Sequence, residues 1–504
     1  MTNHRINKVL VANRGEIAVR VLRTCKELGI ATVAVFSEPD RTAPHVRLAD
    51  EAYEIGPAPS SQSYLAVDKI LDVARHSGAD AIHPGYGFLS ENAAFAEACT
   101  EADVIFIGPP PKAIRAMGDK TAARLLMQEA GVPMAPGTPD AIDDADEAAH
   151  IAGEIGYPVI IKAAAGGGGK GMRVVEQPDD FRRAMALARS EAQSAFGDGR
   201  VFIEKYIEQP RHIEFQILAD RHGHTVHLFE RECSIQRRHQ KVIEEAPSAI
   251  LTPEVRAEMG AAAVRTAQAC GYVNAGTVEF LVDAELNFYF MEMNTRLQVE
   301  HPVTEWVTGL DLVAEQIRIA EGEALGYTQD ELSLHGHAIE CRVYAEDPAN
   351  NFLPDPGRLL RHAPPSGFGV RVDAGVEQHG EVLIHYDPMI SKLTTWGRTR
   401  AEAIRRMDRA LDEYDIAGVE TTLPFCRFVM QHDAFRRGHF STHFVAQHFD
   451  PASLRDPAPD AERAAALAAV LYRAIQQPAT PAATPMGNGT TAAPESPWRR
   501  RQRY

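Results

Sequence analysis

Short apolar runs alternate with amphipathic stretches along the first hundred residues of the chain. Residues 9–12 and 32–36 are rich in β-branched and aliphatic side chains, whereas residues 17–28 place apolar side chains at helical spacing and end before Gly29. Strands that alternate with helices predict parallel strands joined by right-handed crossovers. We therefore expect a Rossmann-like layer over residues 7–105.

The loop after the first predicted strand reads Asn-Arg-Gly-Glu at residues 13–16. A dinucleotide-binding layer carries a Gly-x-Gly-x-x-Gly turn at this point, because glycine lets the backbone approach a pyrophosphate. The loop lacks that turn, so the layer need not bind a nucleotide.

Beyond residue 206 the pattern mixes strands and helices. Residues 214–218, 225–229, 277–282 and 288–293 have the pattern of strands, and residues 253–270 and 311–321 have helical spacing. These segments predict a large mixed sheet. Residues 460–476 predict an Ala-rich helix, and the Pro-, Ala- and Thr-rich stretch after it cannot bury a core, so we expect disorder there.

Composition narrows the class of protein. The 504 residues are enough for about three domains. The net charge of −17, from 52 Lys+Arg against 69 Asp+Glu, disfavours binding to nucleic acid. No run approaches the roughly 18 apolar residues that span a bilayer, and the N-terminus has no secretory apolar region. Six widely spaced cysteines fit a reducing compartment, so we expect a cytoplasmic protein without membrane contact.

A run of glycines interrupts two apolar segments at residues 158–175. Gly166, Gly168 and Gly171 formally spell Gly-x-Gly-x-x-Gly, but residues 172–175 continue as a strand instead of opening a helix. The pattern therefore predicts strand, glycine loop, strand. Such a run is most often a plain flexible loop; Lys162, which we expect to be buried by its apolar neighbours, favours a loop that folds over nucleotide phosphates.

Two glutamates are predicted to face each other in the hairpin at residues 277–294. With its turn between Glu285 and Leu286, antiparallel pairing places Glu279 opposite Glu292. Opposed carboxylates repel, so such a pair commonly faces water. Phe288 and nearby apolar residues argue for burial instead, and buried like charges need a cation such as Mg²⁺.

The next loop carries one guanidinium, one amide and one carboxylate, at Arg296, Gln298 and Glu300. A solvated loop can hold such residues by chance. Beside a metal site they favour an anion pocket with its own general base. The basic segment at residues 236–241, taken alone, is typical of a solvated strand face.

Seven stretches share their motifs with one enzyme family. They are residues 9–17, 83–92 and 117–120, the glycine run, and residues 233–241, 292–305 and 344–348. In these motifs and their order, from about residue 8 to residue 450, the chain resembles the biotin carboxylase family of ATP-grasp ligases.

The resemblance implies a fold of class α/β and α+β in four parts. These are a Rossmann-like N-terminal domain at 1–113, an ATP-grasp domain at 114–334 with a mobile glycine-loop lid at 135–206, a biotin carboxylase C-terminal domain at 335–450, and an Ala-rich helix with a disordered tail at 451–504.

The resemblance also implies the site residues. ATP would be bound by Lys120, Lys162, Gly168, Gly169, Glu204, Lys205, Tyr206, Ile207, His212, Gln236, His239, Glu279 and Leu281. Mg²⁺ or Mn²⁺ would be held by Glu279, Glu292 and Asn294. Bicarbonate and biotin would be bound by Lys241, Arg296, Gln298, Val299, Glu300 and Arg342, of which Lys241, Arg296, Glu300 and Arg342 would be catalytic.

In the implied reaction Glu300 deprotonates bicarbonate, which attacks ATP to give carboxyphosphate, and Arg342 stabilises the biotin enolate that takes up CO₂. The sequence has no Ala-Met-Lys-Met biotinylation motif, so we expect biotin on a separate carrier protein that also serves a carboxyltransferase subunit. Family habit favours a homodimer.

Two alternatives remain. Another ATP-grasp ligase, of the carbamoyl-phosphate or glycinamide-ribotide type, would share the phosphate machinery but not Arg296, Glu300 and Arg342. A non-catalytic regulatory homologue would be expected to lack a metal ligand or the base, and the sequence retains both.

Overall fold

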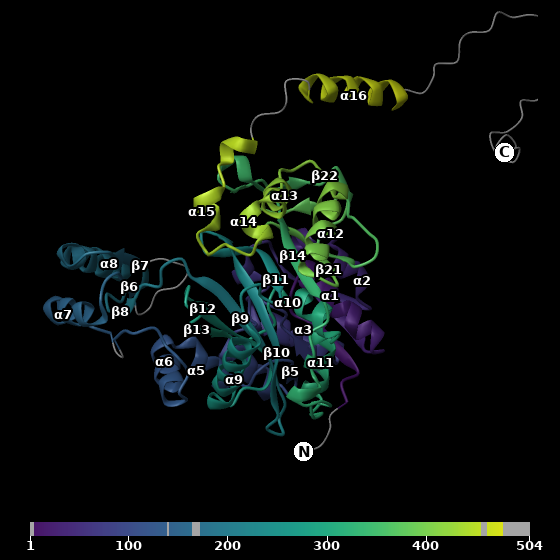
Figure 1. Ribbon diagram of the computed structural model, residues 1–504. Coiled ribbons are helices and arrows are strands. Elements are labelled where there is room, and N and C mark those ends of the chain that lie inside the picture. The colour runs from purple at the N-terminus through teal and green to yellow at the C-terminus, as the bar shows by residue number, and fades with distance from the viewer. Residues whose placement is uncertain (1–4, 139–140, 164–171, 455–460, 477–504) are drawn as a thin grey trace, which may run out of the picture. The chain divides into compact units, whose positions relative to one another are not determined.

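The computed structural model describes residues 5–138, 141–163, 172–454 and 461–476. The chain forms one unit over residues 1–451 and a second over residues 452–504 (Figure 1). The predicted contacts of Gly168 and Gly169 and the predicted disordered tail after residue 476 lie outside the described residues. In the described part no helix combines the length and apolarity needed to cross a bilayer.

The N-terminal layer is a parallel sheet, as predicted. Its strands lie in the order β3 (Glu51–Gly56), β2 (Ala31–Ser37), β1 (Lys8–Val11), β4 (Ala81–His83) and β5 (Ile105–Phe106). Its helices are α1 (Gly15–Glu27), α2 (Pro44–Leu48), α3 (Val67–Ser77) and α4 (Ala93–Glu101).

A small antiparallel sheet follows helices α5 (Pro111–Gly118) and α6 (Lys120–Glu129). Its strands are β7 (Met172–Val175), β6 (Val159–Ala163) and β8 (Val201–Lys205), and α7 (Ala145–Ile155) and α8 (Phe181–Phe196) pack against it. The predicted strand on each side of the glycine run is confirmed.

The large sheet has eight strands and spans far separated parts of the sequence. Their order is β13 (Phe288–Asn294), β12 (Asn274–Val282), β9 (Arg211–Ala219), β10 (Thr225–Arg237), β11 (Gln240–Ala246), β14 (His337–Tyr344), β21 (Met389–Gly397) and β19 (Val370–Ala374). Every pairing is antiparallel, so the predicted mixed sheet is wrong. Short turns account for the antiparallel pairing of β9 with β10, β10 with β11 and β12 with β13. Arg238 and His239, both with positive φ, join β10 to β11.

The remaining elements cover the large sheet or surround its C-terminal strands. The helices are α9 (Pro253–Ala269), α10 (His301–Thr308), α11 (Leu312–Ala320), α12 (Arg400–Glu413), α13 (Leu423–Gln431), α14 (Asp433–Arg436) and α15 (Phe444–His448). Short strands are β15 (Glu346–Asp347), β16 (Leu353–Pro354), β17 (Gly357–Arg358), β18 (Arg361–Ala363), β20 (Glu381–Val382) and β22 (Asp415–Ala417). The second unit contains α16 (Ala461–Gln476).

Local chemistry sets the helix ends close to where the pattern predicts them. Helix α9 begins at Pro253, which has no N–H to lose in the first turn, and the Thr252 hydroxyl accepts a hydrogen bond from the Val255 N–H. Gly271, with φ +62°, follows its last turn.

One hydrophobic cluster connects the N-terminal layer to the loop that follows β13. Ile17 and Leu22 of α1 share this cluster with Leu312 and Ile317 of α11 and with Leu297, which is fully buried. Leu297 lies between Arg296 and Gln298, so packing of the core fixes the segment on which the predicted anion pocket depends.

Candidate active site

The loop from Thr295 to Glu300 connects β13 to α10 and carries the centre of the site. Gln298 and Glu300 are buried, whereas Arg296 and Val299 are half-buried. Glu300 is the residue before the first turn of α10, and Pro302 stands in that turn, which sets the direction in which the chain enters the helix.

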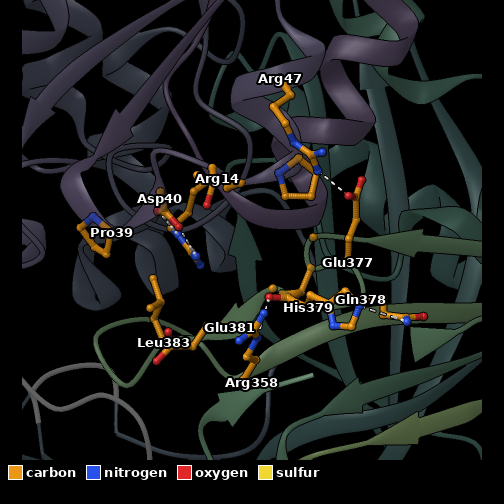
Figure 2. A pocket seen from close by; sticks show the side chains of 16 residues that line it. Arg14, Pro39, Asp40, Arg47, Arg358, Glu377, Gln378, His379, Glu381 and Leu383 are labelled. Atoms are coloured by element: carbon orange, nitrogen blue, oxygen red, sulfur yellow. Dashed lines mark hydrogen bonds and ion pairs between the residues drawn. The ribbon is translucent and has the colours of Figure 1, made fainter. Parts of the chain in front are cut away.

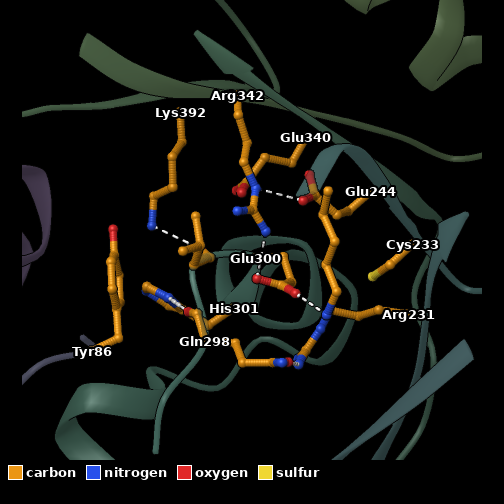
Figure 3. A network of polar contacts seen from close by, with 12 residues as sticks. Tyr86, Arg231, Cys233, Glu244, Gln298, Glu300, His301, Glu340, Arg342 and Lys392 are labelled. Atoms are coloured by element: carbon orange, nitrogen blue, oxygen red, sulfur yellow. Dashed lines mark hydrogen bonds and ion pairs between the residues drawn. The ribbon is translucent and has the colours of Figure 1, made fainter. Parts of the chain in front are cut away.

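Glu300 lies between two cations. Its Oε1 accepts a hydrogen bond from Lys241 Nζ at 2.7 Å, and its Oε2 accepts one from Arg342 Nη2 at 2.9 Å (Figure 3). Burial opposes ionisation, but Lys241, Arg342 and Arg231 outweigh it and hold the pKa of Glu300 well below its usual range. The site therefore contains an ionised carboxylate in a dry, cationic setting.

Lys241 connects three carboxylates. Besides Glu300 its ammonium contacts Glu214 and, at 2.8 Å, Glu279 Oε1. Burial alone would lower the pKa of Lys241, but these three glutamates raise it well above its usual value. Lys241 therefore stays charged and holds the predicted base and the predicted metal ligand in one cluster.

The predicted pairing of Glu279 with Glu292 is confirmed. The Oε1 atom of Glu279 accepts hydrogen bonds from Asn294 Nδ2 at 2.9 Å and Gln298 Nε2 at 2.7 Å, and its Oε2 lies 2.9 Å from His212 Nε2. Burial opposes ionisation of Glu279 as well, yet Lys241 and His212 hold its pKa well below the ordinary value.

The expected burial of both carboxylates is wrong for Glu292, which is exposed, while Glu279 is 3% exposed. The pairing shifts by one residue after Glu279, so that Phe280 lies opposite Phe290 and Val282 opposite Phe288. These four apolar residues pack together in a core cluster. Regular alternation would place Phe288, Phe290 and Glu292 on one face, but the extra residue at the shift puts the two phenylalanines on the face opposite to the carboxylates.

The oxygens on the paired strands β12 and β13 suit a hard divalent cation. Glu279 and Glu292 offer carboxylates and Asn294 offers an amide oxygen, which are the donors that Mg²⁺ and Mn²⁺ prefer. One carboxylate is open to solvent and the other is ionised by its neighbours, so the donor set fits the predicted metal.

The strand before the glycine run is less buried than predicted at Lys162. Val159, Ile161 and Ala163 point into the core, whereas the Lys162 side chain is 31% exposed and its ammonium contacts Glu204. Alternation along β6 explains the difference, since Lys162 has the same orientation as the half-buried Ile160.

The other residues predicted to bind ATP fall in two places. Glu204, Lys205, Tyr206 and Ile207 form the end of β8 and the turn after it, where Lys205 Nζ donates to the carbonyls of Gly156 and Tyr157 at 2.9 and 3.0 Å. The side chain of Lys120 is outside the described part.

A second group lies on β9, β10 and β12. Gln236 Nε2 lies 2.9 Å from His212 Nδ1, which connects Gln236 to Glu279 through the imidazole. Gln236 and its neighbour Arg237 are buried, so the solvated strand face expected for residues 236–241 is wrong there. Only the turn, with His239 exposed, matches it, and Leu281 is half-buried.

Comparison with known proteins agrees with this geometry. The profile described as "Biotin carboxylase, N-terminal domain" matches residues 5–114, "Carbamoyl-phosphate synthase L chain, ATP binding domain" matches residues 119–328, and "Biotin carboxylase C-terminal domain" matches residues 340–447. The chain belongs to the biotin carboxylase family. The predicted resemblance and the predicted fold class are thereby confirmed.

Individual relatives cover nearly the whole family region. The chain is 59% identical over 442 residues to a pyruvate carboxylase subunit of Methanothermobacter thermautotrophicus, covering 88% of this chain and 90% of the relative. It is 56% identical to a biotin carboxylase of Nostoc, covering 88% and 99% of the two chains.

A solved structure is similar over about the same share of the chain. The biotin carboxylase domain dimer of Hydrogenobacter thermophilus 2-oxoglutarate carboxylase, in complex with MgADP, ADP and bicarbonate, has a TM-score of 0.84 and 50% identity. The similarity covers 90% of this chain and 100% of that chain.

The biotin carboxylase site of this chain also depends on residues that the sequence did not single out. Arg231 is fully buried and donates five hydrogen bonds, of 2.5 to 3.0 Å, to Glu214, Gln216, Thr277, Gln298 and Thr304. No local signal marked it, because Arg231 stands between two other charged residues, Glu230 and Glu232, just beyond the predicted strand at 225–229.

Two further contacts fix the loop itself. Glu91 accepts from Arg296 Nε at 3.0 Å and from the backbone N–H of Thr295 at 3.0 Å. Lys392, which is fully buried, donates to the Val299 carbonyl at 2.8 Å and lies 3.2 Å from Glu16 Oε2. Residues of the N-terminal layer and of β21 thus hold the biotin carboxylase loop from two sides.

A pocket of about 490 Å³ lies elsewhere, between residues 39–47 and 375–383 (Figure 2). Its charges are largely paired, Arg14 with Asp40 at 2.6 Å and Arg47 with Glu377. Its lining includes none of the predicted site residues of the described part, so we assign it no role in the chemistry of the family.

Proposed function

We propose that the chain catalyses the ATP- and bicarbonate-dependent carboxylation of biotin presented by a carrier protein, the first half-reaction of a biotin-dependent carboxylase. The observation that carries the proposal is Glu300, an ionised carboxylate held between Lys241 and Arg342. Family membership supports the same activity.

In the proposed first step Glu300 removes the proton of bicarbonate, which then attacks the γ-phosphate of ATP and forms carboxyphosphate. Arg296, Gln298, Lys241 and the Val299 N–H would bind the bicarbonate oxygens. The contact of Lys392 with the Val299 carbonyl supports this role, because it limits movement of the backbone there.

In the proposed second step carboxyphosphate breaks down to CO₂ and phosphate, and the phosphate takes the proton of the biotin nitrogen. Arg342 stabilises the negative charge on the ureido oxygen while that nitrogen takes up CO₂. A guanidinium that is already buried and oriented gives more stabilisation than one that must be desolvated during the reaction. The contacts of Arg342 with Glu300 and Glu244 support such preorganisation.

The ATP residues act in this proposal as a cradle for the nucleotide. The predicted set stands: Lys120, Lys162, Gly168, Gly169, Glu204, Lys205, Tyr206, Ile207, His212, Gln236, His239, Glu279 and Leu281. Glu279, Glu292 and Asn294 would hold Mg²⁺ or Mn²⁺, which supplies positive charge to the phosphate oxygens when bound.

We further propose that residues 135–206 move as a lid within an ATP-grasp domain at 114–334, between domains at 1–113 and 335–450. The small sheet with its own hydrophobic cluster supports a separately moving lid. A homodimer and a carboxyltransferase partner are part of the proposal; the dimeric relative from Hydrogenobacter thermophilus supports the former.

The decisive experiment measures phosphate release and carboxybiotin formation with free biotin. We expect phosphate release that requires bicarbonate, rises on addition of biotin, and is accompanied by label from ¹⁴C-bicarbonate in biotin. ATP hydrolysis that is indifferent to bicarbonate, or that depends on another amine or carboxylate substrate, would contradict the proposed function.

A further inference from the structure

Several glutamates lie opposite one another in the large sheet, and one such pair faces Arg342. Glu244 of β11 lies directly opposite Glu340 of β14, and both side chains are fully buried. Directly opposed residues in an antiparallel pair have Cβ atoms about 5 Å apart, and like charges at that distance are destabilising. Two buried carboxylates in such a place commonly retain one proton between them.

The hydrogen bonds of the two carboxyl groups point to the same conclusion. Glu244 Oε1 accepts from Arg342 Nε at 2.6 Å, and Glu340 Oε2 accepts from the Thr394 hydroxyl at 3.1 Å. Their second oxygens, Glu244 Oε2 and Glu340 Oε1, are both buried without a hydrogen-bond partner among the described residues. A proton on one carboxyl group would give this pair the donor that it needs.

The charges around the pair decide where the proton resides. Burial raises the pKa of Glu244 to about 7, with Arg342 opposing the rise and Glu300 adding to it. Burial raises the pKa of Glu340 well above the ordinary value, against the effect of Lys392 and with the help of Glu244. Above about pH 7 Glu340 therefore carries the proton and Glu244 is the carboxylate.

Other titratable groups also face the pair. Lys241 favours ionisation of Glu244, whereas Glu300 opposes ionisation of Glu340. The phenol of Tyr344 and the thiols of Cys233 and Cys341, whose pKa values are all raised primarily by burial, stay neutral. The pair thus faces cations from β11, β14 and β21 and one carboxylate from the loop before α10.

We propose that Glu244 and Glu340 form a carboxyl pair that holds one proton and positions Arg342, with Glu244 fixing Nε so that the terminal nitrogens face Glu300 and biotin. Figure 3 shows the Arg342 guanidinium between Glu244 and Glu300. Both glutamates are positioning residues. The inference rests on the proposed function, because Arg342 is assigned to biotin there.

The proton matters because either other charge state loosens the arrangement. With both carboxyl groups ionised, two negative charges would attract Arg342 away from Glu300. With both protonated, Arg342 Nε would lose the charge-assisted hydrogen bond that fixes the plane of its guanidinium. One proton on the pair leaves one anion for Arg342 Nε and a second, Glu300, for its terminal nitrogen.

Glu244→Gln tests the positioning role. Losing a charged hydrogen-bond partner should raise KM for free biotin roughly 10- to 100-fold and leave bicarbonate-dependent ATP cleavage within about threefold of wild type. In the wild type, KM for biotin should also rise as pH falls through about 7, the pKa of Glu244. That dependence should be absent from the variant.

Glu245→Gln is the matched control. Glu245 is the next residue on β11, is equally buried, and contacts His337 at 2.7 Å and Arg400 at 2.6 Å instead of Arg342. Its loss should lower stability without changing KM for biotin. An unchanged KM and pH profile in Glu244→Gln would overturn the proposal, as would an equal rise in KM in Glu245→Gln.

The shared proton has its own test. Infrared spectroscopy of the wild type at neutral pH should show the C=O stretch of a buried carboxylic acid, and this band should disappear in Glu340→Gln. The KM of that variant for biotin should stay within about threefold of wild type, because glutamine replaces the neutral acid with a neutral amide. An infrared spectrum that is the same in wild type and Glu340→Gln would overturn the shared proton. If the wild type lacked bicarbonate-dependent ATP cleavage, the proposed function would fail, and the infrared result would still decide the state of the pair.

Discussion

Two of the opposed glutamate pairs in the large sheet, Glu279 with Glu292 and Glu244 with Glu340, differ in their surroundings. In the first pair one carboxylate is exposed and the other accepts hydrogen bonds from Lys241, Asn294 and Gln298. In the second both are fully buried. The same arrangement of like charges thus suits a cation in one place and a proton in the other.

The position of each pair in the sheet explains the difference. Strand β13, which carries Glu292, ends the strand order of the sheet, so solvent and ligands can reach it. Strand β14, which carries Glu340, lies between β11 and β21, and α10 packs against all three. A hydrated metal ion needs open access, whereas a single proton does not.

The largest expected effects come from replacing Arg342 and Glu300. Arg342→Ala should lower biotin carboxylation on the order of 10²- to 10³-fold yet retain some bicarbonate-dependent ATP cleavage, because carboxyphosphate can still form and decompose in water. Glu300→Ala should lose both activities. Phosphate release and carboxybiotin are measured side by side; equal loss of ATP cleavage in both variants would assign Arg342 to bicarbonate alone.

Glu292→Gln should separate the pair that suits a cation from the pair that suits a proton. Removing a carboxylate ligand should lower turnover roughly 10- to 100-fold and raise the concentration of Mg²⁺ needed for half-maximal rate. Glu340→Gln is the matched comparison, and we expect its magnesium dependence to equal that of the wild type. A magnesium titration that is identical for wild type and Glu292→Gln would show that Glu292 holds no metal.

Lys162→Gln should have a smaller effect, confined to nucleotide affinity. Loss of one partly exposed cation that is proposed to face the phosphates should weaken ATP binding by about tenfold, and the Glu204 carboxylate keeps its contact with Arg124. Titration of ATP into the folded variant measures this effect. Wild-type ATP affinity in this variant would favour the alternative, that the glycine run is a plain flexible loop without a role in nucleotide binding.

The last expected effect is on stability, and its dependence on pH has opposite signs for Glu244 and for its neighbour Glu245. The pKa of Glu244, raised to about 7 by burial, favours the protonated form in the folded protein, so its contribution is present below the ordinary pKa of 4.5 and is lost as pH rises through 7. The pKa of Glu245 is lowered to about 2 because Arg400 and His337 overcome burial, so its contribution is present above 4.5 and is lost as pH falls through 2.

Thermal unfolding of wild type and Glu244→Gln from pH 5 to 8 checks the sign. We expect the wild type to lose about 1 to 3 kcal/mol relative to the variant over this range. A relative gain as pH rises would contradict a proton held at Glu244 and Glu340.

The sequence could predict those features that depend on residues close to one another in the chain. The parallel layer, the strands around the glycine run and the pairing of Glu279 with Glu292 all depend on residues within one hairpin or one βαβ unit. The shift in pairing after Glu279 was not predictable, because the alternation of side chains continues through it in the sequence. That shift misled the prediction for Glu292.

Contacts between distant segments were out of reach for a different reason. Glu244 and Glu340 are almost a hundred positions apart, and nothing in either segment specifies that β11 pairs with β14. Arg231 is similar: its partners lie on β9 and β12 and around α10, so its role depends on the assembled sheet. Family motifs pointed to the proposed catalytic groups, but not to the residues that hold them.

The contacts of Lys392 have a consequence for synthesis of the protein. This ammonium supports the Val299 carbonyl from a strand that the ribosome makes more than ninety residues later, and Arg342 also follows Glu300 in the chain. A nascent polypeptide that has already folded its nucleotide-binding part therefore lacks the cations that complete the bicarbonate loop. The loop proposed to bind bicarbonate therefore gains its last contacts only after translation has passed β21.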